Sequence, residues 1–311
     1  SQSLDLLLNV PVPTITGYST QMQNIGKVQN RGMEFTLNTK NLTGEFSWSS
    51  NFNISFNKNK VLEVGVDGRP IYGSAANANN AFITKPGYPI ASFYGYKYIG
   101  VFQSEEELAK YPHLSGDKVG DGRYEDVNKD GVLDQNDKTI LGDNNPLFTA
   151  GFSNSFSYKN FTLDIQFTGS YGAEVFSFYK RMCGIYHGDR NGMIEQLGRW
   201  QSKDQPGDGI HFRPTRTPSG WQRGPSSAWV QDASYLRLRN LTLGYNFDQK
   251  VLDKMKMKGL RLYVTGQNLF TITNYVGYDP ETSSESGLAQ GGDYLGYPAA
   301  RSFIIGANIT F

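Results

Sequence analysis

The sequence predicts an all-β protein of long antiparallel strands, and three observations lead to that fold class. Apolar and polar side chains alternate over several long segments, aromatic residues reach 14% with 35 glycines, and charged residues are only 19%. A disordered chain would instead be poor in aromatics and rich in charge. No apolar run approaches the roughly 18 residues of a transmembrane helix. A net charge of +1 gives no sign of a nucleic-acid-binding surface.

The strands are predicted from alternation with a period of two, because successive side chains of a strand point to opposite faces. Apolar side chains alternate with Ser, Thr, Asn and Gln in segments 33–37, 46–56, 148–156, 161–167, 236–247, 260–264 and 303–311. Within 236–247 the apolar positions change from even to odd numbers after Leu238. This change of phase predicts a β-bulge near residues 239–240.

The length of these segments favours a membrane barrel over a soluble sandwich. They run over about 10–14 residues, whereas strands of globular proteins have a mode of about 5–6. A strand that crosses a bilayer needs about 9–11 tilted residues, with aromatic residues near both interfaces. Several segments end in aromatic residues, namely Phe56, Tyr158, Phe247, Phe270 and Phe311. A soluble sandwich would also alternate, but it explains neither this length nor the uniformly neutral polar face.

The lengths of the connections predict which side of the membrane each one occupies. Residues 40–44, 159–160 and 248–258 are short connections, and residues 10–27, 59–146, 172–232 and 271–300 are long ones. Outer-membrane barrels have short periplasmic turns and long extracellular loops. We therefore expect the long loops outside, with subdomains at about 59–146 and 172–232, and the C-terminus in the periplasm. Short helices are expected at 105–111, 193–202 and within 248–258.

Counted in this way, the chain crosses the membrane eight times. Eight strands can close a small barrel, but the first strand is short and the loops are large for so small a rim. The first residues lack the basic and apolar regions of a signal peptide. We therefore expect the 311 residues to be the C-terminal part of a larger barrel, without a plug domain.

One segment predicts a calcium-binding loop. The sequence DVNKDGVLDQND, residues 126–137, fits the pattern D-x-[DN]-x-[DN]-G with a carboxylate at position 12. The predicted ligands are Asp126, Asn128, Asp130, the carbonyl of Val132, Asp134 and Asp137. Position 12 is Asp instead of Glu and no clear helix precedes the loop, so an ordinary turn is the alternative. A structural Ca²⁺ would stabilise a long loop that is expected to have little core of its own.

Aromatic residues of the long loops are candidates for contact with a ligand or a partner protein. The candidates are Tyr94, Tyr96, Trp221, Trp229 and Tyr294. Flat aromatic faces suit sugar rings, and the alternative is that these side chains pack the loops together. No nucleophile elbow or phosphate-binding loop is present, and the single Cys183 cannot form an internal disulfide. The sequence therefore predicts a binding or transport protein and not an enzyme.

Four passages resemble the SusC/RagA family, the TonB-linked outer-membrane proteins of Bacteroidota. They are DLLLNVPVPTITGYSTQMQNIGKVQNRGMEFTLN (5–38), DASYLRLRNLTLGYNF (232–247), GLRLYVTGQNLFTIT with NYVGYDPE (259–281), and SFIIGANITF (302–311). Their order and spacing agree with the family, so the resemblance covers nearly the whole chain. The passages NIGKVQNRGMEF and ASYLRLRNLTLGY are the most specific.

The resemblance implies the fold and function of a larger protein. Family members are 22-stranded barrels with an N-terminal plug, a size that belongs to plugged transporters. They import oligosaccharides or, in some cases, peptides, with energy supplied through TonB. A SusD-like lipoprotein covers the extracellular face, and two transporter–lid pairs are expected to associate. Two alternatives remain open at this point, a small eight-stranded barrel that displays adhesive loops and a secreted soluble β-protein.

Overall fold

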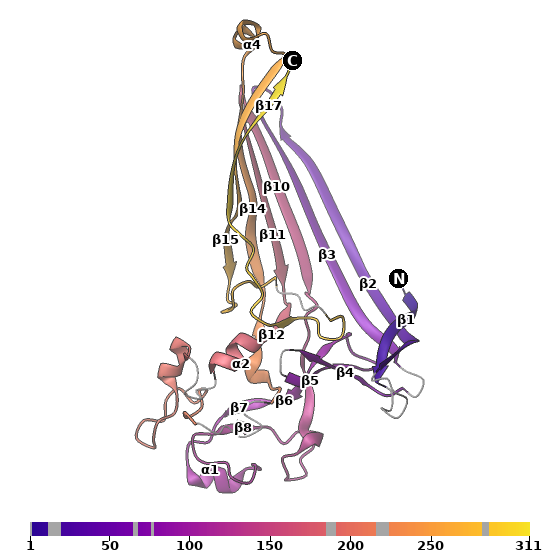
Figure 1. Ribbon diagram of the computed structural model, residues 1–311, viewed down its shortest axis with the longest axis vertical. Helices are drawn as coiled ribbons and strands as arrows, with labels where there is room; N and C mark the ends of the chain where they lie inside the picture. Colours follow the sequence, from indigo (N-terminus) through magenta and orange to yellow (C-terminus); the bar gives the residue numbers. More distant parts are fainter. Residues whose placement is uncertain are drawn as a thin grey trace.

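The body of the molecule is one large antiparallel sheet (Figure 1). The computed structural model describes residues 2–11, 20–64, 68–75, 78–184, 191–215, 224–281 and 286–311. In spatial order the strands of the sheet are β1 (Gln2–Pro11), β2 (Thr20–Leu42), β3 (Phe46–Val64), β10 (Phe148–Tyr158), β11 (Phe161–Tyr171), β14 (Tyr235–Asn246), β15 (Gly259–Thr273) and β17 (Ser302–Thr310). Strands β1 and β17 form its two edges. The predicted all-β class and the predicted strands of the large sheet are confirmed. The expectation that residues 93–102 form one strand was wrong, because the segment is divided between two strands, 92–96 and 98–101, that belong to different sheets.

The register of the sheet follows from the alternation. Strands β10 and β11 pair without a shift from Phe148↔Tyr171 to Tyr158↔Phe161. The predicted bulge is confirmed, because the pairing of β14 with β15 shifts between Leu238 and Asn240. Because of the extra residue, the apolar side chains after the bulge point to the same face of the sheet as the apolar side chains before it.

One face of the large sheet exposes a continuous apolar surface. Its exposed members include Met33 at 66%, Phe303 at 73% and Ile305 at 85% of their full accessible area. Cross-strand partners such as Phe52↔Phe152 and Phe152↔Phe167 continue this surface from strand to strand. Soluble monomers rarely expose apolar patches beyond a few hundred Å². The surface therefore contradicts the soluble β-protein and fits a wall that contacts lipid.

The long loops fold into a separate body beyond one end of the sheet, away from α4 (Gln249–Met255) and the C-terminus (Figure 1). The described residues of this body form three small sheets. They comprise β4 (Ile71–Ala75), β5 (Ala78–Thr84), β6 (Ser92–Tyr96) and β9 (Lys138–Gly142); β7 (Tyr98–Val101) and β8 (Gly122–Tyr124); and β13 (Val230–Asp232), β12 (Glu174–Ser177) and β16 (Gly292–Asp293). Loops 59–146, 172–232 and 271–300 thus contribute strands to one loop body.

The loop body has a hydrophobic core of its own. Phe82 and Phe93 from the first long loop pack against Phe176 and Phe178 from the second, and all four are completely buried. Ala289 from the last long loop joins the same cluster. The expectation that loop 59–146 has little core was wrong, because residues far apart in sequence supply the apolar surface that it buries.

One glycine marks the close approach of two long loops. A Cβ on Gly95 of β6 would lie 2.2 Å from the carbonyl oxygen of Pro225, so no larger residue fits this backbone. The next amide, of Tyr96, donates to that carbonyl at 3.0 Å. Loop 172–232 is therefore joined to β6 by backbone contact as well as by the apolar core.

Two of the three predicted helices are confirmed. Helix α1 (Glu105–Lys110) is capped by Ser104, whose hydroxyl accepts the amide of Glu107 at 3.2 Å. Helix α4 lies in the predicted connection 248–258. The helix predicted at 193–202 was wrong, since only the 3₁₀ turn η3 (Ile194–Gly198) forms. The carbonyl of Gly198 accepts the amide of Asp208 at 2.8 Å, and this tertiary contact replaces the next helical hydrogen bond. In the described ranges no helix has the length and hydrophobicity to cross a membrane.

Candidate functional site

The face opposite the apolar surface is lined by neutral polar side chains. Hydroxyl and amide groups pair across neighbouring strands, as in Ser47···Ser157 at 2.6 Å and Thr242···Thr265 at 2.8 Å. The ion pair of this face between Arg261 and Asp164 is long, at 3.9 Å. The alternation of the sequence predicted this face, which offers hydrogen-bond donors and acceptors with little net charge.

Polar side chains at Asn154 and its cross-strand partner Ser50 interrupt the apolar face. The side chain of Asn154 is buried between its neighbours, and its carbonyl oxygen accepts bonds from Trp48 Nε1 at 2.9 Å and Ser50 Oγ at 2.7 Å. The ring of Trp48 also stacks on Phe156. These partners satisfy the amide oxygen, which lowers the cost of placing Asn154 on a surface that faces an apolar environment.

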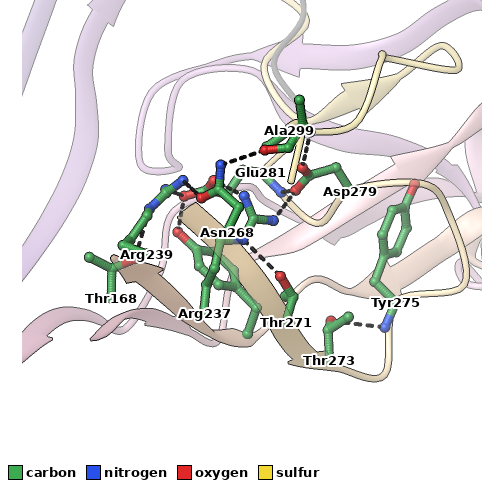
Figure 2. Close-up of polar contacts among 12 residues, drawn as sticks. Thr168, Arg237, Arg239, Asn268, Thr271, Thr273, Tyr275, Asp279, Glu281 and Ala299 are labelled. Atoms are coloured by element: carbon green, nitrogen blue, oxygen red, sulfur yellow. Dashed lines mark hydrogen bonds and ion pairs between the residues drawn. The ribbon is translucent and has the colours of Figure 1, made fainter. Parts of the chain in front are cut away.

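The largest ionic network of the loop body fixes loop 271–300 to the sheet, and Figure 2 shows it. Arg237 on β14 is almost completely buried, and its guanidinium donates to Asp279 at 2.5 Å, to Glu281 at 2.7 Å and to Thr271 at 2.8 Å. Arg239 also donates to Glu281. We call Arg237, Arg239, Asp279 and Glu281 the arginine clamp. Two cations and two carboxylates thus balance each other at the end of the strand.

Hydrogen bonds extend the clamp along the loop. The second oxygen of Asp279 accepts the amide of Ala299 at 2.9 Å, and the side chain of Asn268 donates to the carbonyl of Ala300 at 3.1 Å (Figure 2). The Tyr235 hydroxyl donates to Glu281. Both arms of loop 271–300 are therefore attached to β14 and β15. Sequence reasoning missed this site, although two arginines close together on a face of mostly neutral polar residues were a usable signal.

The clamp predicts how attachment of the loop depends on pH. Burial alone would raise the pKa of Asp279, but donors from Ala299, Arg237 and Glu281 together hold it below the ordinary value. A carboxylate with a pKa lowered by folding stabilises the folded state above its ordinary pKa, and this contribution is lost as the pH falls through the lowered value. The protection of residues 274–281 against hydrogen exchange, relative to the intrinsic exchange rate at each pH, should be constant from neutral pH to about pH 5 and fall below about pH 4. A step above pH 5 would contradict this account, and Asp279→Asn should remove the step.

A cavity of about 550 Å³ lies inside the loop body. Tyr98, Phe212 and Trp229 form its aromatic wall, and Lys180 and Glu195 are among its polar lining residues. Burial lowers the pKa of the Lys180 amine, and the charge of Glu195 partly opposes that effect. The volume falls in the range of small-molecule sites, about 300–1,000 Å³.

The structure separates the predicted aromatic candidates into different environments. Tyr294 is 57% exposed and Tyr94 is half-buried. Tyr96 packs against Tyr124 and Trp229 against Phe212, and both are buried. Trp221 lies outside the described residues. Contact of Tyr96 with a ligand is disfavoured by its burial, whereas Trp229 still borders the cavity.

The first half of the predicted calcium loop is a series of tight turns. The two oxygens of Asp126 accept the amides of Lys129 at 2.7 Å and Gly131 at 2.9 Å. Asp130 accepts the amide of Val132 at 2.9 Å, and Asn128 accepts the amide of Asp130 at 3.0 Å. Gly131 has a φ of +84°. The predicted sharp turn at this glycine is confirmed, and the side chains of the first half turn toward the loop itself.

The second half of the loop ends in a buried carboxylate. Asp137 has no exposed surface, and its two oxygens accept the amides of Val127 at 2.9 Å and Asp134 at 2.8 Å. Asp134 caps the 3₁₀ turn η2 (Gln135–Asp137). Through the described part of the chain, no three His, Cys, Asp or Glu side chains are grouped as metal ligands. Calcium binding therefore stays a prediction.

Comparison with known proteins gives a consistent family for the whole chain. It is 36% identical to TonB-dependent receptor P3 of Formosa agariphila and 35% identical to TonB-dependent receptor P26 of the same species, over 99% of this chain and 31% of each relative. TonB-dependent receptor SusC of Bacteroides thetaiotaomicron is 29% identical, again over 99% of this chain. The chain thus spans about a third of the length of these relatives. No family model matches the sequence.

A solved structure supports the same fold. The structure of the RagAB peptide transporter superposes on the whole chain with a TM-score of 0.80 at 22% identity, and this chain covers 32% of it. The open-open state of the RagAB peptide importer gives a TM-score of 0.76. Sequence and fold agree with the apolar and polar faces described above. The chain belongs to the SusC/RagA family of TonB-linked outer-membrane receptors, and its large sheet is a section of their transmembrane β-barrel.

Proposed function

We propose that this chain forms part of an outer-membrane importer that takes up oligosaccharides with energy supplied through TonB. The observation that carries the proposal is a barrel wall with an apolar outer face and a neutral hydrogen-bonding inner face, in a chain that matches TonB-dependent receptors over 99% of its length. Import is the activity of the complete receptor. The chain contributes wall strands and the long loops that surround the entrance.

The chemistry of the inner face favours an oligosaccharide over a charged peptide as cargo. Paired amides and hydroxyls such as Asn38 with Asn51 and Ser47 with Ser157 offer many weak, uncharged contacts. A hydroxyl-rich sugar can exchange such hydrogen bonds from site to site as it moves. A peptide with charged side chains would need compensating charges, and the 3.9 Å pair of Arg261 and Asp164 supplies few. A related structure is named a peptide importer, so peptides remain the competing cargo.

The loop body is the proposed contact surface for a SusD-like lipoprotein lid. Its shared core and the arginine clamp hold three long loops in one rigid unit, which suits repeated docking of a partner. Exposed aromatic side chains on loop 271–300, Tyr294 at 57% and Tyr297 at 100%, supply the type of residue that is enriched at protein interfaces. Two such transporter–lid pairs would form the complete assembly.

Uptake by the complete receptor tests the proposal. Cells that carry the receptor with its neighbouring lipoprotein should accumulate fluorescently labelled neutral oligosaccharides, and deletion of TonB should abolish accumulation. Labelled peptides of similar mass serve as the competing cargo. Uptake of peptides alone would overturn the oligosaccharide assignment. Normal uptake without TonB would overturn the assigned energy source, and stable folding of these 311 residues as a small barrel in detergent would favour the display-barrel alternative.

We propose, as a separate point, that residues 126–137 bind a structural Ca²⁺. The support is the sequence pattern, the turn at Gly131 and the presence of six oxygen-bearing positions within one twelve-residue segment. The loop carboxylates accept backbone amides, so an ion would have to share or displace these bonds. A site of this kind in an extracellular module is expected to bind with a Kd of about 10⁻⁴–10⁻³ M.

Calcium should protect this loop against proteolysis in the complete receptor. We expect millimolar Ca²⁺ to slow cleavage within residues 118–140, because the bound ion would oppose opening of the loop. Asp130→Ala should remove the protection, whereas Asp204→Ala, an exposed acid elsewhere in the loop body, should retain it. Equal cleavage with Ca²⁺ and with chelator would show that the segment is an ordinary turn.

A further inference from the structure

Two basic side chains oppose each other on the outer face of the large sheet. Arg31 on β2 and Lys58 on β3 are direct cross-strand partners, and both are exposed. The next pair toward the membrane on the same face is Met33↔Phe56, which begins the apolar surface. The basic pair thus lies one step beyond the apolar band, toward the end of β3 that leads into β4 of the loop body.

An aromatic row marks this level as a membrane interface. Phe56 on β3 contacts Phe148 on β10 with ring centroids 6.0 Å apart, and Phe148 stacks on Tyr171 of β11 at 5.4 Å. Aromatic girdles lie at the interfaces of transmembrane barrels. Residues directly beyond such a row lie at the depth of lipid headgroups. Arg31 and Lys58 therefore face the headgroup layer and not the pore.

A groove joins the basic pair to the apolar band. It has a volume of about 530 Å³ and forms where β3 continues past its last pairing with β10. Arg31 and Lys58 line its polar part, and Met33, Phe56 and Leu147 line its apolar part. A groove with this polarity matches a lipid, with an anionic headgroup at one end and acyl chains at the other.

The basic pair has no anionic partner among the residues that the structure describes. Like charges that lie directly opposite on neighbouring strands destabilise a sheet. Nearby Lys27, in contrast, pairs with Glu63 at 3.4 Å. Asp143 also lines the groove, but its Oδ1 accepts the amide and the side chain of Asn145, each at 2.8 Å, and within the described chain it forms no ion pair. An external anion between Arg31 and Lys58 would turn the repulsion into attraction.

We propose that this groove binds a phosphorylated lipid of the leaflet on the side of the loop body, with the phosphate held by Arg31 and Lys58. A guanidinium binds phosphate oxygens in a bidentate manner, and an ammonium adds a point charge. The acyl chains lie along Met33, Phe56 and Leu147. The proposal rests on the proposed function in one respect, namely that the apolar face contacts the outer membrane.

Native mass spectrometry of the complete receptor in detergent tests the site. The probes are dioleoyl phosphatidic acid and dioleoyl phosphatidylcholine, which share their acyl chains, and free inorganic phosphate is the competitor. We expect preferential binding of phosphatidic acid, which Arg31→Gln with Lys58→Gln should weaken by roughly tenfold or more. Lys250→Gln with Lys254→Gln makes the same charge change on α4, at the opposite end of the sheet, and should retain binding.

Three results would overturn the proposal. They are equal binding of the two lipids, unchanged binding by the Arg31 and Lys58 double variant, and full displacement by inorganic phosphate, which would indicate an anion site without a lipid role. Without lipid, the double variant should unfold at the same or a higher temperature, because a like-charge pair has been removed. The readout needs no cargo, so a failure of import leaves the result on lipid binding interpretable.

Discussion

Replacement of Arg237 by methionine should destabilise the attachment of loop 271–300 to the barrel by about 3–5 kcal/mol, the usual cost of removing one partner from a buried ion pair. Arg237 is almost fully buried and donates to Asp279 and Glu281. Methionine fills part of its volume but leaves both carboxylates with fewer donors in a partly desolvated position. Hydrogen exchange of residues 274–281 in the complete receptor should therefore accelerate strongly, with a lower unfolding temperature.

The matched control for this change is Arg261→Met in the neighbouring strand. Arg261 also lies on the polar face, but its nearest carboxylate, Asp164, is 3.9 Å away and both side chains are more than a third exposed. Exposed ion pairs contribute about 0–1 kcal/mol, so this variant should change stability little. Equal effects of the two substitutions would mean that the clamp contributes no more than an ordinary surface pair.

The large sheet could be predicted from the sequence because its two faces meet different surroundings. Alternation of Phe152 and Phe156 with Ser153 and Ser155 fixes the parity of β10, and the same reasoning located the bulge before Asn240. The exception at Asn154 depends on cross-strand hydrogen bonds from Trp48 and Ser50. A local pattern carries no information on such partners.

The loop body could be predicted only in part, because its stability comes from contacts between distant segments. Helix α1 has local signals, an N-cap serine and acidic residues in its first turn. The segment after Gly198 and the burial of Trp229 depend instead on residues that are remote in sequence. The clamp likewise joins Arg237 to Asp279 across 42 positions. Alternation identifies the face of a strand, and it does not identify which loop will cover that face.

Replacement of Phe176 by alanine should be the most disruptive single change in the loop body. The ring is completely buried and contacts Phe82, Phe93 and Phe178 with centroid distances of 5.9, 6.1 and 5.3 Å. Truncation of a buried phenylalanine costs about 3–5 kcal/mol, because it removes apolar contacts and leaves a cavity. Since the ring joins two long loops, both should lose protection against hydrogen exchange together.

The measurement is hydrogen exchange of the complete receptor, followed in peptides that cover β5, β6 and α2 (Phe178–Gly184). Tyr297→Ala is the control, because Tyr297 is completely exposed in the same loop body and its loss should change stability by no more than about 0.5 kcal/mol. Protection of β10 and β11 should be unchanged, since the large sheet does not depend on this core. Faster exchange confined to α2 would mean that the loops fold independently. A lid protein would then dock on separate loops, and the rigid surface inferred for it would not exist.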